Sequence, residues 1–150
     1  MVPPSPSAGE WSTRGLKSST VTASTATAKT TRYTFNDGSF TDYTQTYDGA
    51  GKYTGDQISE YKNGFHYIAQ FSADGTQVYW GKETFYAGRV DYRYWGYPAQ
   101  GNCGTGNWCG SQERLDSNGY RISAGNYTVP ASELTTTAND GLYFRGLANQ

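Results

Sequence analysis

Short stretches in which apolar and polar residues alternate run along the chain from residue 31 to residue 97. In the clearest stretch, Val90, Tyr92 and Tyr94 alternate with charged residues, so that one face is apolar and the other polar. Alternation with one polar face is typical of an antiparallel sheet. The pattern predicts six strands, at about residues 31–36, 39–47, 52–60, 65–72, 76–86 and 89–97.

Turn residues separate these stretches at regular intervals. The glycines at positions 38, 51, 64, 75 and 88 recur every 11 to 13 residues, and most of them lie in Asn-Gly or Asp-Gly clusters. Such clusters supply the positive φ values that tight hairpins require. The spacing therefore predicts a β-meander, in which each strand pairs with the next one along the chain.

The last third of the chain gives weaker signals. Residues 115–122 predict another hairpin around an Asn-Gly turn. Residues 126–134 predict a strand whose Pro130 suits a sheet edge, and residues 142–145 predict a last short strand. No helix is predicted, because the best candidate, residues 131–134, is too short. The expected fold is all-β, an antiparallel meander that forms a small sandwich or barrel.

The first 31 residues differ in composition from the rest. Three prolines open this segment, and residues 18–31 are nearly all Ser, Thr and Ala. Such a composition is typical of an extended linker or stalk. We therefore expect an extended N-terminal arm at residues 1–31 and a single β-rich domain at residues 32–150. Because the arm has few apolar groups to offset the entropy of ordering, we expect it to pack on another chain.

Composition and charge narrow the classes of partner. The chain has 14 Tyr and 4 Trp, and these large side chains can form a core even when Tyr hydroxyls reach water. A net charge of −1, with Lys and Arg that form no run, argues against nucleic-acid binding, which requires a basic surface. No apolar stretch is long enough to span a membrane, so no membrane insertion is predicted.

Candidates for catalysis are few. No Ser or Cys nucleophile motif lies near the single histidine, His66, in the sequence, so no catalytic triad is predicted. A glycosidase needs two carboxylates, and the weak candidates are Glu60 and Glu83, because both lie in predicted strands that could face one another. A salt-bridged sheet face explains these acids more simply. No cofactor and no metal are predicted.

The only two cysteines, Cys103 and Cys109, are separated by five residues, two of which are Gly. A loop this short and flexible can close into a disulfide with little strain, and we expect the two to be bonded in an oxidising compartment. The alternative is two free thiols that pack. Zinc is not expected, since this pair and the single His do not complete a structural four-ligand site.

A cluster of aromatic and amide residues overlaps the cysteine loop. Flat rings beside amides suit sugar stacking or a protein contact, and a disulfide would hold them on a rigid tip. The alternative is that the rings close one end of a thin core. The candidate binding residues are Tyr92, Tyr94, Trp95, Tyr97, Asn102, Asn107 and Trp108.

These observations together predict a non-enzymatic structural or adhesive β-module of an extracellular assembly. A virion decoration or tail protein, or a surface appendage subunit, fits the pattern, and the expected location is extracellular or on a virion surface. The expected partners are protein subunits of the same assembly or a surface glycan, and the protein is expected to be oligomeric or assembly-bound. A secreted carbohydrate-binding module is the alternative, and a small glycoside hydrolase is the third hypothesis.

Overall fold

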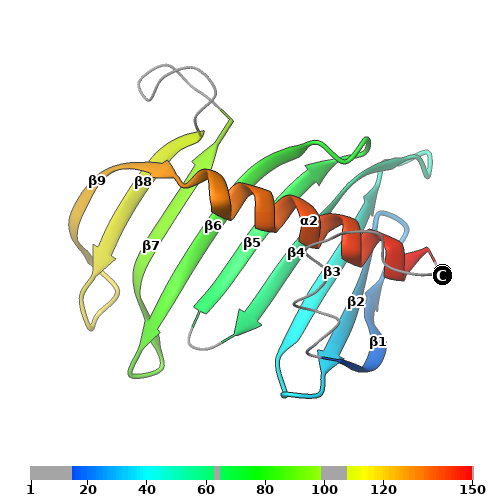
Figure 1. The fold of residues 1–150 in the computed structure, drawn as a ribbon, viewed down its shortest axis with the longest axis horizontal. Helices are drawn as coiled ribbons and strands as arrows, with labels where there is room; N and C mark the ends of the chain where they lie inside the picture. Colours follow the sequence, from blue (N-terminus) through cyan, green and yellow to red (C-terminus); the bar gives the residue numbers. More distant parts are fainter. Residues whose placement is uncertain (1–14, 63–64, 99–107, 150) are drawn as a thin grey trace.

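The computed structural model describes residues 15–62, 65–98 and 108–149. They form one nine-stranded antiparallel sheet, in which each strand pairs with the next along the chain, and one helix that crosses a face of the sheet (Figure 1). The predicted antiparallel meander is thus confirmed. The strands are β1 (Leu16–Ser24), β2 (Ala28–Phe35), β3 (Phe40–Tyr47), β4 (Tyr53–Lys62), β5 (Phe65–Ser72), β6 (Gln77–Tyr86), β7 (Arg89–Tyr97), β8 (Trp108–Leu115) and β9 (Arg121–Val129).

The six strands predicted between residues 31 and 97 are confirmed as β2 to β7, and the hairpin at residues 115–122 joins β8 to β9. Gly38, Gly51, Gly75 and Gly88 each have a positive φ at a turn, as the turn pattern requires. The meander follows from this local chemistry, because each short turn returns the chain beside the strand that it has just left.

The sheet is open. Strand order runs from β1 to β9, so these two strands are its edges, and it does not close into a barrel. The layer packed against it is a helix, α2 (Ala131–Ala148), so the prediction of no helix is wrong. The strand expected at residues 126–134 ends with β9 at Val129, and residues 142–145 lie in the helix instead of a last strand.

Pro130 separates β9 from the helix. Its φ of −59° and its missing N–H suit a position just before the first helical turn, whereas they would interrupt a strand ladder. The helix escapes detection in the sequence because its buried face is not an apolar stripe. That face consists of Thr137, Asp140, Gly141, Tyr143 and Phe144.

The core lies between α2 and the central strands β2 to β5. Phe144 is fully buried and its ring contacts those of Tyr33, Phe35 and Tyr43 at centroid distances of 5.7 to 6.3 Å. Stacked, tilted and edge-on aromatic pairs such as these are favourable at these distances. Tyrosine therefore supplies much of the core that aliphatic residues supply in most domains.

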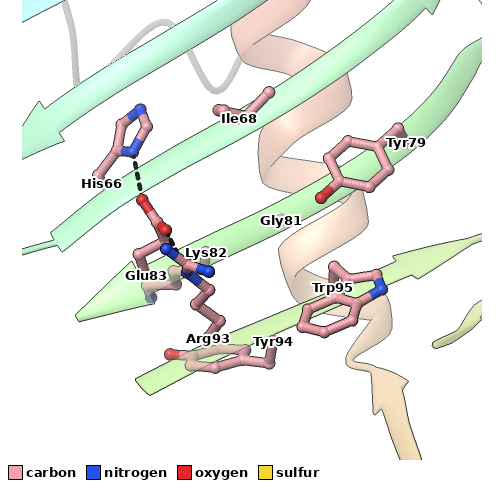
Figure 2. A pocket seen from close by; sticks show the side chains of 9 residues that line it. All are labelled: His66, Ile68, Tyr79, Gly81, Lys82, Glu83, Arg93, Tyr94 and Trp95. Atoms are coloured by element: carbon pink, nitrogen blue, oxygen red, sulfur yellow. Dashed lines mark hydrogen bonds and ion pairs between the residues drawn. The ribbon is translucent and has the colours of Figure 1, made fainter. Parts of the chain in front are cut away.

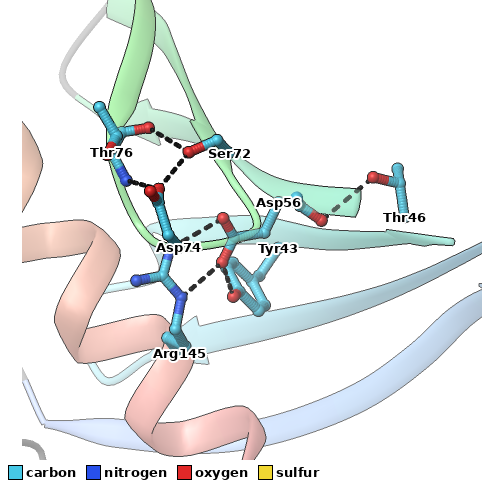
Figure 3. A network of polar contacts seen from close by, with 8 residues as sticks. Tyr43, Thr46, Asp56, Ser72, Asp74, Thr76 and Arg145 are labelled. Atoms are coloured by element: carbon cyan, nitrogen blue, oxygen red, sulfur yellow. Dashed lines mark hydrogen bonds and ion pairs between the residues drawn. The ribbon is translucent and has the colours of Figure 1, made fainter. Parts of the chain in front are cut away.

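Polar contacts fix the helix to the sheet along its length. The Glu133 carboxylate lies 3.8 Å from the Lys82 ammonium of β6, and the Tyr67 hydroxyl of β5 donates to Asp140 at 2.5 Å. Further along, the Arg145 guanidinium donates two hydrogen bonds to Asp56 of β4, at 2.9 and 3.0 Å (Figure 3).

The part of the predicted N-terminal arm that the structure describes, residues 15–31, forms β1 and the start of β2. All nine residues of β1 are exposed at the sheet edge. That the arm packs on another chain stays a prediction. In the described part of the chain, no helix is both long enough and apolar enough to cross a membrane.

Candidate functional site

The sheet face opposite α2, called the open face below, aligns side chains from neighbouring strands in rows. The strand registers place Ser59, Ile68, Gly81, Trp95 and Ser111 side by side from β4 to β8. Because side chains alternate between faces along each strand, residues paired across the sheet share a face. The next row along the strands contains a continuous series of ring-stacked and charged residues, Phe40, Tyr61, His66, Glu83, Arg93 and Glu113.

That neighbouring row begins with stacked rings. The rings of Phe40 and Tyr61 have centroids 4.9 Å apart, and the Arg32 guanidinium lies 3.9 Å above the Phe40 ring centroid. Tyr61 in turn stacks on the imidazole of His66 at 4.2 Å, with 8° between the ring planes. These contacts hold His66 in one orientation, and it is almost fully buried although it lies on the open face.

A chain of hydrogen bonds and ion pairs continues the row from His66 toward β9. The His66 Nδ1 atom lies 3.0 Å from Glu83 Oε1, and Arg93 Nε donates to Glu83 Oε2 at 2.7 Å. Glu113 lies beyond, with carboxylate oxygens 3.7 Å from Arg93 and 3.9 Å from Arg121. Both oxygens of Glu83 are thus engaged, which fixes that carboxylate between the imidazole and the guanidinium.

Ser59 contacts the other side of the imidazole. Its Oγ atom lies 2.7 Å from His66 Nε2. An ionised carboxylate can only accept hydrogen bonds, so in a neutral imidazole the proton beside Glu83 lies on Nδ1. The Nε2 atom is then unprotonated and accepts a hydrogen bond from the Ser59 hydroxyl. Serine, histidine and an acid therefore stand in hydrogen-bonded sequence on the open face.

A hollow of about 130 Å³ adjoins this group (Figure 2). Gly81 forms its floor, and Ile68, Tyr79 and Trp95 lie around it. The Tyr79 ring lies across the glycine, because a Cβ at position 81 would stand 2.6 Å from the phenol oxygen. Burial, with Tyr97 and Glu83 nearby, raises the pKa of Tyr79, so its hydroxyl stays neutral and able to donate at physiological pH.

The predicted aromatic cluster is divided by the sheet. Trp95 and Tyr97 lie on the open face, where the Tyr97 ring is 5.3 Å from that of Tyr79. Tyr92, Tyr94 and Trp108 belong to the opposite face, because successive strand residues alternate. Asn102 and Asn107 lie outside the described residues.

The helix side of this cluster is a packed ring group. Trp80 is buried, and its ring lies 5.8 Å from that of Tyr94 and 6.1 Å from that of Tyr127. Burial raises the pKa of Tyr94, with added effects from Tyr127 and from Glu133 of the helix. The Tyr94 ring therefore packs against this end of the core, and its predicted role in binding stays a prediction.

Glu60 and Glu83 do not form a carboxylate pair. Glu60 is only 2% exposed and shares a register position with Tyr67, whose hydroxyl points to the helix. Glu83 lies on the open face with His66. The two weak candidate acids lie on opposite faces of the sheet, so they do not form the carboxylate pair that a glycosidase needs, and the hypothesis of a small glycoside hydrolase stays a prediction.

The cysteine prediction falls partly outside the structure. Cys109 pairs with Tyr97 at the end of the β7–β8 ladder, and Cys103 lies outside the described residues. Their disulfide stays a prediction. Among the residues that are described, no three His, Cys, Asp or Glu side chains gather closely enough to hold a metal ion.

Ser59 is the functional candidate that the sequence reasoning missed. It lies seven residues before His66, on the other arm of the β4–β5 hairpin. The predicted Asn63-Gly64 turn would have paired Tyr61 with His66 and placed Ser59 diagonally beside the imidazole. Counting residues outward from the predicted turn would therefore have placed Ser59 beside His66. A search for a nucleophile motif in consecutive residues could not find this contact.

The fold and the site define the class of this protein. It is an open antiparallel sheet with a helix on one face and, on the other face, a hollow lined by aromatic rings. Comparison with known proteins adds no relative: no family model, no curated protein and no solved structure matches the chain. The function must therefore be inferred from the residues of the site.

Proposed function

We propose that this protein is a contact module of an extracellular assembly and that its open face binds a glycan. The observation that carries the proposal is the hollow over Gly81, which lies between the rings of Tyr79 and Trp95. Sugar rings have apolar C–H faces that stack on aromatic rings, and hydroxyl groups that need hydrogen-bonding partners. The site offers both kinds of group.

Polar atoms surround the hollow in the required way. Glu83 and Arg93 form one rim, and the Tyr79 hydroxyl lies above the floor. The volume is below the range of about 300–1,000 Å³ for pockets that bind drug-sized ligands, and so it suits one sugar ring of a longer chain. A long glycan could continue along the open face, past the hydrogen-bonded amides of Gln57 and Gln70.

Trp95→Ala tests this proposal. Removing a central aromatic contact should cost at least about 2 kcal/mol of binding, roughly a 30-fold rise in Kd. The measurement is retention of the full chain on cellulose, chitin and xylan, followed by calorimetry with soluble fragments of any polysaccharide that retains it. Tyr86→Ala is the control, because Tyr86 is 67% exposed at the β6–β7 hairpin and far along the strand from the hollow.

Two outcomes contradict glycan binding. One is a wild-type chain that none of these polysaccharides retains. The other is a Trp95→Ala variant that folds normally and binds as tightly as Tyr86→Ala. Circular dichroism of both variants checks that the fold is unchanged.

A second candidate is contact with protein subunits through the sheet edge. The nine residues of β1 are all exposed, and an edge strand can pair with a strand of another chain. Val21→Lys should then weaken association in sedimentation velocity, because it places a charge on the edge. Val78→Lys, at an exposed valine of the interior strand β6, should leave association unchanged. A chain that is monomeric at every concentration contradicts this candidate.

A further inference from the structure

Ser59, His66 and Glu83 are arranged as nucleophile, base and orienting acid, a role beyond binding. We propose that this group transfers the acyl group of a small, activated carboxylic ester to Ser59 and then to water. The inference shares the hollow and Glu83 with the proposed glycan site, but it does not depend on glycan binding, since it is argued from the hydrogen bonds of Ser59 and His66. Its basis is the order of hydrogen bonds: Ser59 Oγ to His66 Nε2 at 2.7 Å, and His66 Nδ1 to Glu83 Oε1 at 3.0 Å.

This order is the one that nucleophilic catalysis requires. A serine hydroxyl is a weak nucleophile until a base removes its proton, and the base must present an unprotonated nitrogen. Glu83 accepts the proton of Nδ1, which leaves Nε2 directed at Ser59. Arg93 holds the far oxygen of Glu83 at 2.7 Å, and Tyr61 stacks on the imidazole, so both partners are held in position.

The hollow gives the acyl group a place beside the nucleophile. Ser59 pairs with Ile68 in the strand register, and Ile68 pairs with Gly81 at the hollow's floor. An ester whose carbonyl carbon meets Ser59 Oγ can lay its acyl group over Ile68, toward the rings of Tyr79 and Trp95. Ser59 itself is half-buried, so its hydroxyl can be reached from the open face.

The reaction balances with water as the only co-reactant. His66 Nε2 takes the hydroxyl proton while Oγ forms a bond to the carbonyl carbon, and the resulting tetrahedral intermediate expels the alcohol, which receives that proton from Nε2. Water then attacks the acyl-serine, gives one proton to Nε2, and forms the new C–O bond. Collapse releases the carboxylic acid and returns the proton to Ser59 Oγ.

The substrate class follows from what stabilises the transition state. Ser59 lies in β4, which is paired with β3 on one side and with β5 on the other, so the backbone N–H groups of this strand are engaged in the sheet and do not supply an oxyanion hole. General-base catalysis by a positioned histidine contributes about 100- to 10,000-fold, whereas an oxyanion donor would add about 100- to 1,000-fold more. Esters with good leaving groups and short acyl chains are therefore the expected substrates.

The test uses 4-nitrophenyl acetate and the full chain. We expect release of nitrophenol above the buffer rate, with one acetyl group on the peptide that contains Ser59 when the reaction is quenched early. Ser59→Ala should abolish both signals, and His66→Gln should slow acylation at least about 100-fold. Ser111→Ala, at a serine in the same row on the far side of Trp95, should match the wild type.

Glu83 and Arg93 are positioning residues and need a separate readout. Glu83→Gln should slow acylation as His66→Gln does, and Glu83→Asp should restore part of the rate, because a carboxylate can still accept from Nδ1. A merely structural role for Glu83 would not distinguish these two variants when both are folded by circular dichroism.

The proposal is overturned by any of three results. These are a wild-type rate equal to that of buffer, a rate unchanged in folded Ser59→Ala, or acetylation confined to lysine residues. Retention of Ser59→Ala on a glycan that binds the wild type would separate the two functions, since this variant leaves the hollow and its rings in place. Failure of acyl transfer with intact glycan retention therefore counts against this inference alone.

Discussion

The buried pair of Asp56 and Arg145 should be the most sensitive point in the contact between helix and sheet. Arg145→Met removes the guanidinium and keeps most of the side-chain volume. The Asp56 side chain is 0% exposed, so its carboxylate would lose two charge-assisted hydrogen bonds in a place that water does not reach (Figure 3). Breaking such a pair from one side costs about 3–5 kcal/mol.

The tyrosine that also donates to Asp56 does not compensate for this loss. Tyr43 donates its hydroxyl to the same carboxylate, and burial together with Asp56 raises its pKa, so it stays neutral. Burial alone would lower the pKa of Arg145, but its hydrogen bonds to Asp56 raise that pKa above the ordinary value. The guanidinium is therefore the only positive charge that these contacts provide to balance Asp56.

The measurement is urea unfolding at neutral pH, followed by tryptophan fluorescence, in which buried Trp80 reports on the sheet. Arg32→Met is the matched control. The Arg32–Asp42 pair has the same two-point geometry, at 2.7 and 2.8 Å, but the Arg32 side chain is 43% exposed. Exposed pairs contribute about 0–1 kcal/mol. A domain of this size has a free energy of unfolding of about 5–15 kcal/mol. Arg145→Met should therefore unfold at a clearly lower urea concentration than Arg32→Met.

A double variant, Asp56→Leu with Arg145→Met, gives the refuting comparison. Replacing a buried ion pair by apolar residues of similar volume is often neutral or stabilising, so the double variant should be more stable than Arg145→Met alone. Two results would contradict this prediction: Arg145→Met costing no more than Arg32→Met, or a double variant that is less stable than Arg145→Met alone.

Three further outcomes can be checked directly. Cys103 and Cys109 should resist alkylation in native material until a reductant is added, which intact mass will show. The Asp74 carboxyl should titrate with a pKa of about 2 in NMR, because the Ser72 hydroxyl and nearby N–H groups favour its charged form. The contribution of this carboxylate to stability is complete above the ordinary pKa of 3.8 and is lost as the pH falls through about 2. Ser72→Ala should raise the pKa of Asp74. Tyr67→Phe removes a buried hydroxyl that joins the sheet to α2, and should lower the free energy of unfolding by about 1–3 kcal/mol.

The meander could be predicted from the sequence because its information is local. Each turn glycine lies between two alternating stretches, and positive φ values at Gly38, Gly51, Gly75 and Gly88 confirm the turns that these stretches require. The register then follows from turn length, since a hairpin pairs residues at equal distances from its turn. Nothing in this step requires knowledge of the distant parts of the chain.

The helix could not be predicted in the same way. It contains three consecutive Thr residues and, further on, Asn139, Asp140 and Gly141, which are weak helix formers. Its buried face includes polar Thr137, which an apolar periodicity does not register. The contacts that stabilise this segment come from Tyr67 and Asp56, more than 70 residues away in the chain.

The aromatic site was predicted from closeness in sequence, and the strand geometry divides it between the two faces of the sheet. Tyr94 and Trp95 are neighbours in β7, and this adjacency places them on opposite faces of the sheet. Tyr94 packs with the buried Trp80, whereas Trp95 borders the open hollow. Tyr79, the other ring of the hollow, comes from a different strand and was not among the candidates.

The polar contacts that position α2 on one face of the sheet also affect the arrangement of the side chains on the open face. Apolar contacts are non-directional, so an apolar stripe would let α2 slide along the sheet, whereas hydrogen bonds from Tyr67 to Asp140 and from Arg145 to Asp56 define one position. These contacts engage β5 and β4, the strands that carry His66 and Ser59 on the other side. The helix thus fixes the two strands whose side chains form the Ser59–His66 contact, and a variant that loosens α2 should disturb that contact without touching it.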